Sequence, residues 1–443
     1  MTIVSETKKE RYSYVFWLMM DAFYVLFAVR YVLHVNFPAI VFLAWVTVMS
    51  FVFDKDEIIA LVISFFPLYP GFQYKYAILI CTVVLLLKCF RKIRINAIVY
   101  FVAALMMWEL LHLIGDSGSF SEYLRGFAEL IFLSVVLCVP TTEKRDLSYL
   151  NRLLALSTVV AFFLLMVTTL EVNKISLWEL MQKGFRFGAT GAVEGEFRFN
   201  YNANGFGLIC NMGITAILIN IFLKKAWLID YVMLFVITFA GCLTVSRTFL
   251  LCLALTLVLY IVLQKKSLLY KIIPLVAMAI FCLVFFLIVK EYFPSIIENY
   301  GNRFDVDDVS NGRVDLLAYY NKLLFSSARA LFFGLGMQDI PQHAFEILGG
   351  TELMLEPHNG YQEILVVWGI PGFVLVALIL WCIIGKSVKE KKKVPLIFYL
   401  PLILLAVNIM AGQFVTSGLK MMSLIFIYEV LANSYGASKD NQI

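Results

Sequence analysis

Charged side chains and the motifs of soluble enzymes are scarce in this 443-residue sequence. Only 15% of the residues are charged and 61% are hydrophobic, whereas soluble domains have about a quarter and about half, respectively. The sequence contains no HExxH motif, no glycine-rich phosphate loop and no Ser-His-Asp arrangement. A zinc protease, a nucleotide hydrolase or a serine hydrolase is therefore not indicated.

Spacings typical of metal sites and disulfide frameworks are also missing. All eight cysteines fall inside apolar runs, without a CxxC pair or a Cys/His cluster. The acidic segment FDVDDVS at 304–310 lacks the spacing of a calcium loop. We therefore expect no disulfide framework, no bound metal and no cofactor.

Long apolar runs, by contrast, recur along the whole chain. Many have the roughly 17 to 25 residues that a helix needs to cross the hydrocarbon core of a bilayer. The sequence predicts an all-α polytopic membrane protein with about 14 transmembrane helices (12–14), forming one transmembrane domain over residues 1–443. The first run lacks a small-residue cleavage site, so it is expected to remain as a helix. The predicted spans are 12–33, 37–53, 57–70, 76–90, 95–114, 122–139, 150–170, 202–223, 227–245, 247–263, 272–289, 360–385, 394–410 and 420–435.

The basic loops of the chain give these spans an orientation. An even number of spans puts the basic loops on the side of both termini, and the positive-inside rule makes that side cytoplasmic. The extracytoplasmic side then carries a smaller loop at 171–201 and a large loop at 290–359. The basic loops lie at 91–94, 144–145, 224–225, 265–266 and 386–393.

Part of the large loop has the pattern of a helix. Residues 312–334 predict an amphipathic helix, a partly helical cap that lies on the outer membrane surface or over a cavity. The apolar residues at helical spacing are Leu316, Leu317, Tyr320, Leu323 and Leu324.

Arginine outnumbers lysine on the predicted outer side, whereas lysine predominates on the inner side. The planar guanidinium matches phosphate or carboxylate oxygens with two parallel hydrogen bonds, so the bias suggests an anionic ligand outside. Pairing with loop acids or lipid headgroups would explain it equally well. The outer arginines are Arg30, Arg125, Arg186, Arg198, Arg247, Arg303, Arg313 and Arg329.

Arg247 interrupts a long and otherwise nearly uncharged stretch. A charge near membrane depth costs about 2.5–3.5 kcal/mol on insertion scales, so such a residue usually faces a partner or a cavity. Ser246 and Thr248 on either side add donors that favour an anion site. The alternative is an interfacial arginine that reaches the lipid headgroups.

Arg313 stands at the start of the predicted cap helix, in Asn311-Gly312-Arg313. A glycine turn before a helix leaves backbone amides free beside the guanidinium, which suits an anion. An ion pair of Arg313 with Asp307 or Asp315 is the alternative.

His358 and Asn359 directly precede the apolar run that begins at Gly360. A histidine there lies beside the bilayer and within reach of water. The positive potential of a helix start disfavours the imidazolium, which keeps the ring available as a base. The alternative is an ordinary capping segment with Asn359 as N-cap. His34 and His112 are expected to pack at outer helix ends, and His343 falls in a polar loop.

Several of these features occur together in a known family. Taken in order, they resemble the O-antigen ligase / Wzy-type O-antigen and capsular polysaccharide polymerase family over about residues 195–385. Departures are Gln362, where the family often has Leu, and about 14 helices in place of about twelve. The matching features are Asn202-Ala203-Asn204-Gly205-Phe206, Ser246-Arg247, Gly312-Arg313, Gly334-Leu335-Gly336, His358-Asn359 and Gly369-Ile370-Pro371-Gly372.

The resemblance implies a GT-C-like membrane glycosyltransferase in the bacterial cytoplasmic membrane. Such enzymes use a glycan on undecaprenyl diphosphate, on the extracytoplasmic side, with inversion and without a metal. Arg247 and Arg313 would hold the diphosphate, and His358 would act on the acceptor hydroxyl. The other donor-binding candidates are Ser246, Asn359 and Asn204, followed by Arg198, Arg303 and Arg329.

A polymerase that joins lipid-linked oligosaccharide repeat units is the leading hypothesis, and a ligase that moves a finished glycan to another acceptor is the alternative. A transporter of lipid-linked sugars would place polar residues near span centres, with matching broken helices in two halves. Here the polar residues gather at the outer ends instead. Expected partners are the lipid-linked donor and acceptor, the membrane, a chain-length regulator and a flippase, but no nucleic acid.

Overall fold

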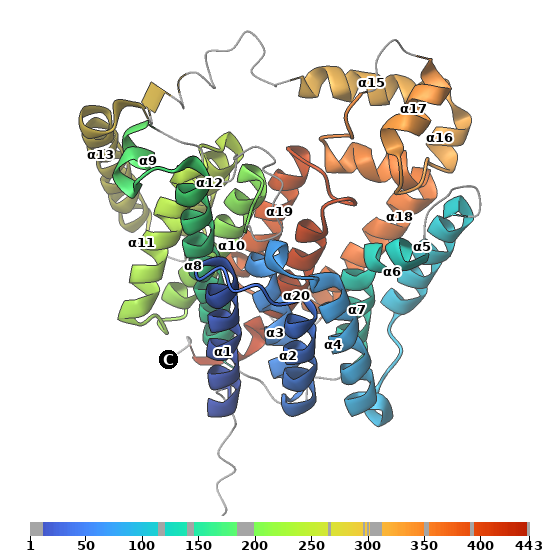
Figure 1. The fold of residues 1–443 in the computed structure, drawn as a ribbon, viewed down its shortest axis with the longest axis horizontal. Helices are drawn as coiled ribbons and strands as arrows, with labels where there is room; N and C mark the ends of the chain where they lie inside the picture. The colour runs from blue at the N-terminus through green and yellow to red at the C-terminus, as the bar shows by residue number, and fades with distance from the viewer. Residues whose placement is uncertain are drawn as a thin grey trace, which may run out of the picture.

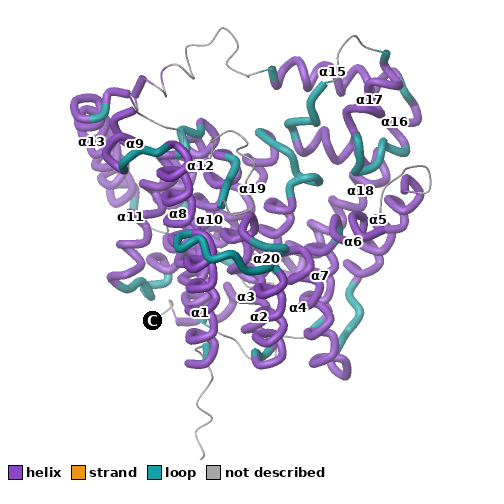
Figure 2. Tube along the Cα trace, viewed as in Figure 1, coloured by secondary structure: helices purple, strands orange, loops and turns teal. Residues whose placement is uncertain are grey.

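The chain folds into a bundle of helices, and the computed structural model describes residues 12–113, 120–139, 146–183, 199–264, 267–295, 297–298, 301, 312–349, 354–389 and 394–440. No strand occurs in these ranges (Figure 2). The helices are α1 (Tyr14–Tyr31), α2 (Ile40–Val52), α3 (Lys55–Leu68), α4 (Tyr74–Cys89), α5 (Ala97–Leu113), α6 (Phe120–Gly126), α7 (Ala128–Cys138), α8 (Leu147–Asn173), α9 (Leu177–Lys183), α10 (Ala203–Phe222), α11 (Leu228–Leu243), α12 (Arg247–Val262), α13 (Leu268–Tyr292), α15 (Arg313–Ser326), α16 (Ala328–Phe332), α17 (Ile340–Leu348), α18 (Gly360–Lys389), α19 (Leu400–Met410) and α20 (Gly418–Asp440).

Every predicted span falls on a helix, which confirms the all-α class. Within the described ranges, α1, α8, α10 and the Gly360–Gly385 part of α18 are long and apolar enough to cross a membrane. Shorter apolar helices include α2, α11 and α12. The structure is consistent with a polytopic membrane protein, while the number of 14 spans and the two loop boundaries stay predictions.

α10 is the buried centre of the bundle. Its side chains are buried on nearly all sides, and it packs against α8, α11 and α12. A helix that is mostly apolar and buried on nearly all sides belongs in the interior of a large or membrane-embedded bundle. Peripheral α11 instead exposes Leu228, Val232 and Phe235 on one stripe, a surface that suits lipid.

Helices α15, α16 and α17 lie across one end of the bundle, above α18 (Figure 1). The helix predicted at 312–334 is two helices, α15 and α16, and its place outside the membrane stays a prediction. Ser327 ends α15 and caps α16, since its Oγ accepts a hydrogen bond from the Ala330 N–H at 3.2 Å. Leu317 remains 37% exposed, in contrast to the other predicted apolar positions, which are buried: Leu316, Tyr320, Leu323 and Leu324.

α18 is broken in the middle at Gly369, whose φ of 65° and ψ of −168° are not helical. Pro371 has no N–H for the carbonyl four residues before it, so the break frees backbone acceptors. Groups from elsewhere in the chain satisfy them. The Leu335 N–H donates to the Val366 carbonyl at 2.8 Å, the Gly336 N–H to the Val367 carbonyl at 2.9 Å, and Trp108 Nε1 to the Trp368 carbonyl at 3.0 Å.

Glycine is required on both sides of this contact. Gly334 has a φ of 85°, and a β-carbon there would lie 2.2 Å from the Val367 carbonyl oxygen. A β-carbon on Gly369 would lie 2.6 Å from the Phe332 carbonyl oxygen. The two glycine motifs singled out in the sequence therefore interlock, fastening α18 to the segment after α16.

Candidate functional site

The N-terminal ends of α10, α12, α18 and α20 meet beneath α15. Ser246 Oγ at the start of α12 donates to Asn204 Oδ1 near the start of α10, at 2.8 Å. A β-carbon on Gly205 of α10 would lie 3.5 Å from the Leu419 side chain of α20. One on Gly360 of α18 would lie 3.1 Å from the Gly412 carbonyl, in the loop before α20. Helix N-termini carry partial positive charge, so their convergence favours an anion.

The turn before α12 is fixed by its own polar side chains. Ser246 is fully buried, and its Oγ accepts a hydrogen bond from the Phe249 N–H at 3.3 Å. Asn202 caps α10 by accepting from the Asn204 N–H at 2.9 Å. Val245 adopts a φ of 48°, which closes the turn tightly. Ser246 and Asn204 are thus bonded to each other, and they position the first residue of α12, which is Arg247.

Arg313 is the first residue of α15 and follows Gly312, whose φ of 73° belongs to the left-handed region. Burial, and then the positive charge of Arg247, lower the pKa of Arg313 from its ordinary value. The structure therefore brings the two predicted arginines together. Within the described chain no ion pair joins Arg313 to Asp315, and Asp307 lies outside the described residues. Two neighbouring cations in a partly buried position suit a bound anion.

Lys420, in the first turn of α20, is a third cation that the sequence interpretation missed. It is 6% exposed, and its Nζ donates to the Asn408 carbonyl at 2.9 Å. The charges of Arg313 and Glu363 both act on it. Its signal was a lone charge within an apolar run, which is the signal that singled out Arg247.

Glu363 in the first turn of α18 was missed as well, and it holds the loop before α20. Its carboxylate is fully buried. Oε2 accepts from the backbone N–H groups of Phe414 and Val415, the latter at 2.9 Å. Oε1 accepts from the Thr416 N–H at 3.0 Å and from the Thr416 hydroxyl at 2.7 Å. With four donors the carboxylate is satisfied, so its role is to fix this loop beside Lys420.

The structure confirms the capping alternative for the segment at His358 and Asn359, while the role of His358 as a base stays a prediction. Asn359 is the N-cap of α18, with Oδ1 accepting from the Tyr361 N–H at 3.1 Å and the Gln362 N–H at 3.2 Å. The Nδ1 atom of His358 is buried and has no hydrogen-bond partner. A buried polar atom without a partner is uncommon in proteins, which makes this ring nitrogen a candidate to bind a ligand.

Gln362, the departure from the family pattern, connects α18 to the cap. Its Nε2 donates to the Leu317 carbonyl at 2.8 Å and to Asn321 Oδ1 at 2.9 Å. Both acceptors belong to α15, the helix that carries Arg313. A leucine could make neither bond, so the glutamine fixes α15 over the start of α18.

Among the other residues singled out in the sequence, Arg329, Arg30 and His34 lie in other surroundings. Arg329 lines a separate cavity beside α5, and Arg198 and Arg303 lie outside the described residues. Arg30, one of the arginines behind the predicted outer bias, is packed: its Nη1 donates to the Phe37 carbonyl at 2.6 Å. His34 is exposed, and its Nε2 lies 3.0 Å from Glu171 Oε1.

The apolar helices define a multi-pass membrane protein whose candidate site is a cationic cluster at one end of the bundle. Residues 232–377 match the model of the family described as O-antigen ligase (Wzy_C). The match contains Arg247, Arg313 and His358, and it confirms the resemblance predicted from the sequence. Asn204 and Lys420 lie outside it. No curated protein matches the sequence.

Proposed function

We propose that the protein transfers a glycan from a polyprenyl-diphosphate-linked donor to a hydroxyl of an acceptor, at the α15 end of the bundle. The observation that carries the proposal is the pair Arg247 and Arg313, two neighbouring guanidinium groups within the region that matches the O-antigen ligase family. A diphosphate has the charge and the oxygen geometry that such a pair prefers.

The cations stabilise the leaving group. When the bond from the anomeric carbon to the diphosphate oxygen breaks, negative charge grows on that oxygen. Arg247 and Arg313, with Lys420 behind them, are already placed to meet this charge, the kind of preorganised electrostatic stabilisation that contributes strongly to catalysis. The proposed reaction uses these side chains in place of a metal ion.

His358 acts on the acceptor. The acceptor hydroxyl oxygen attacks the anomeric carbon while its proton passes to the imidazole, and the diphosphate departs from the opposite face, so the configuration inverts. The unpartnered Nδ1 of His358 supports this role. General-base catalysis of this kind contributes typically 10²–10⁴-fold.

The acceptor distinguishes two activities. The first candidate is a polymerase that joins undecaprenyl-diphosphate-linked repeat units at the outer face of the bacterial cytoplasmic membrane. The second is a ligase that moves the glycan to a different acceptor, and the printed description of the matched family favours it. A transporter is less favoured, because the broken α18 does not leave its carbonyls open to a substrate path.

Reconstitution of the full chain in liposomes with a synthetic lipid-linked repeat unit, without nucleotide or divalent metal, tests the proposal. A ladder of multiples identifies a polymerase. A single transfer product, seen only when a second acceptor is added, identifies a ligase. Absence of any glycan transfer by a folded, monodisperse sample, with movement of the lipid-linked sugar across the bilayer, would support the transporter instead.

A further inference from the structure

A cavity lies away from the cationic cluster. Its volume is about 580 Å³, and it opens between the C-terminal end of α5 and helices α16 and α17. This volume falls within the range of roughly 300–1,000 Å³ of small-molecule sites. It shares no lining residue with the cationic cluster. The lining residues that matter here are Trp108, Leu111, His112, Arg329, Phe333 and Glu346.

One side of the cavity continues the apolar surface of α5. Tyr100, Met107 and Leu111 are 65%, 60% and 59% exposed, and their spacing puts them on one stripe of the helix. Leu111 also lines the cavity. Trp108 stacks on Phe333 with centroids 5.6 Å apart and an angle of 5° between the rings. A hydrocarbon chain that follows the stripe would therefore end at an aromatic wall.

The polar side of the cavity offers one cation and one anion that do not pair with each other. Within the described chain the Arg329 guanidinium makes no hydrogen bond or ion pair. Glu346 accepts a hydrogen bond from Gln342 Nε2 at 2.8 Å, and no ion pair joins it to Arg329. His343 also lines the cavity.

His112 belongs to the wall rather than to the ligand-binding groups. Its Nδ1 and Nε2 lie 3.1 Å from the carbonyl oxygens of Trp108 and Phe333, respectively. These contacts hold the ring against α5 and the segment after α16. Arg329 and Glu346, both exposed, are therefore the charged side chains that a ligand in the cavity would meet.

We propose that this cavity binds the headgroup of a zwitterionic phospholipid. The phosphate lies against Arg329, the ammonium lies against Glu346, and one acyl chain follows the α5 stripe. The guanidinium matches phosphate oxygens, and a carboxylate accepts the hydrogen bonds of an ammonium. The bound lipid would tie α16 and α17 to the bilayer, independently of glycan transfer.

The test is native mass spectrometry of the full chain, with phosphatidylethanolamine and phosphatidylglycerol added separately. We expect the wild type to retain phosphatidylethanolamine about tenfold better than phosphatidylglycerol. This difference corresponds to one charge-assisted hydrogen bond. Arg329→Gln should lower retention of both lipids, whereas Lys322→Met, a charge loss at an exposed position of α15, should not. Glu346→Gln should reverse the preference, a gain of phosphatidylglycerol binding that misfolding does not produce.

Equal retention of the two lipids by the wild type, or an unchanged preference in Glu346→Gln, would overturn the proposal. Displacement of phosphatidylethanolamine by stoichiometric undecaprenyl phosphate would also overturn it, because the cavity would then belong to the substrate lipid.

Discussion

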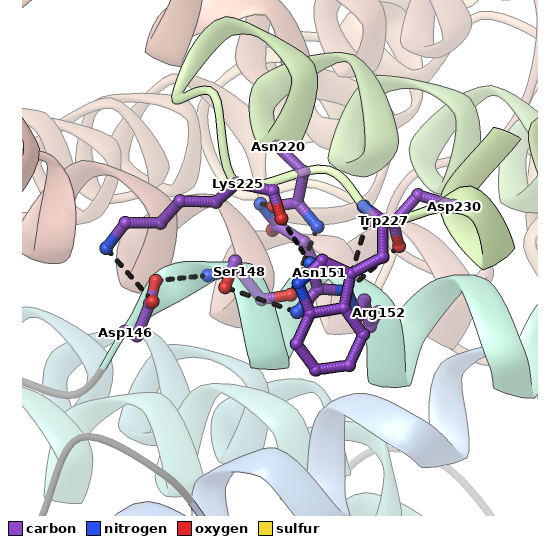
Figure 3. Close-up of polar contacts among 8 residues, drawn as sticks. All are labelled: Asp146, Ser148, Asn151, Arg152, Asn220, Lys225, Trp227 and Asp230. Atoms are coloured by element: carbon purple, nitrogen blue, oxygen red, sulfur yellow. Dashed lines mark hydrogen bonds and ion pairs between the residues drawn. The ribbon is translucent and has the colours of Figure 1, made fainter.

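The two ends of α10 use arginine in opposite ways. At the end where α10 finishes, Arg152 of α8 donates from Nε to both carboxylate oxygens of Asp230, at 3.0 and 3.1 Å (Figure 3). Its guanidinium lies 3.9 Å from the centre of the Trp227 ring and also donates to the Lys225 carbonyl. At the end where α10 begins, Arg313 has Arg247 as its charged neighbour.

The polar groups around the two arginine sites also differ. Around Arg152, Asn151 donates to Asn220 at 2.8 Å, Asn220 donates to the Ser148 carbonyl at 3.1 Å, and Lys225 pairs with Asp146 at 2.9 Å (Figure 3). Other groups of the protein pair with these charges. The hydrogen bonds and ion pairs around Arg152, the Arg152 network, therefore hold helices together. At the other end, we propose that the cationic cluster binds an anionic ligand.

The largest effect on turnover should follow from a change at His358, whose Nδ1 atom has no hydrogen-bond partner. We expect His358→Ala to lower turnover by about 10²–10⁴-fold, because the base for the acceptor hydroxyl is lost. Donor binding should persist. Initial rates and donor titrations in liposomes measure the two quantities. His34→Ala, at an exposed histidine, should leave turnover unchanged, and near wild-type rates for His358→Ala would remove the ring from the reaction.

Removing the ion pair between Arg152 and Asp230 should affect the stability of the protein rather than glycan transfer. Asp230→Ala leaves Arg152 as an uncompensated buried cation, which typically costs about 3–5 kcal/mol. Unfolding by denaturant in detergent micelles measures this loss. Lys225→Met removes the more exposed pair with Asp146 and should cost at most about 1 kcal/mol. Similar losses for the two variants would contradict a structural Arg152 network.

Lys420→Met should weaken donor binding by about tenfold, because one positive charge behind the two arginines disappears. Donor titration in micelles measures the change, with Lys322→Met on α15 as a charge-matched control. A stability loss without a change in donor affinity would assign Lys420 to the packing of α20 and Asn408 alone.

The smallest effect should come from variants that keep the charge. Arg247→Lys and Arg313→Lys should each weaken donor binding about fivefold, since lysine cannot present two parallel donors to one phosphate. Arg91→Lys, at an exposed position of the opposite end, is the control for titrations in the same liposomes. Unimpaired binding in both variants would mean that Arg247 and Arg313 act as general positive charge only.

Features that depend on short stretches of sequence were predictable. Apolar run lengths gave the positions of the helices, and a lone charge in such a run singled out Arg247. Lys420 carried the same signal, but the role of Glu363 was not predictable in this way, since it arises only where α18 meets the loop before α20. The sequence also grouped Arg329 with the other arginines, because only the folded chain places it in a cavity between α5, α16 and α17.

The interlocked glycines have a mechanical consequence. Because the Gly334 backbone lies directly on the Val367 carbonyl, the first half of α18 cannot slide or rotate against α16 without losing backbone hydrogen bonds. Gln362 adds a second connection, from α18 to α15. A tilt of α15 and α16 towards the bundle would therefore carry the start of α18 with it, so that His358 and Arg313 would move as parts of one rigid body.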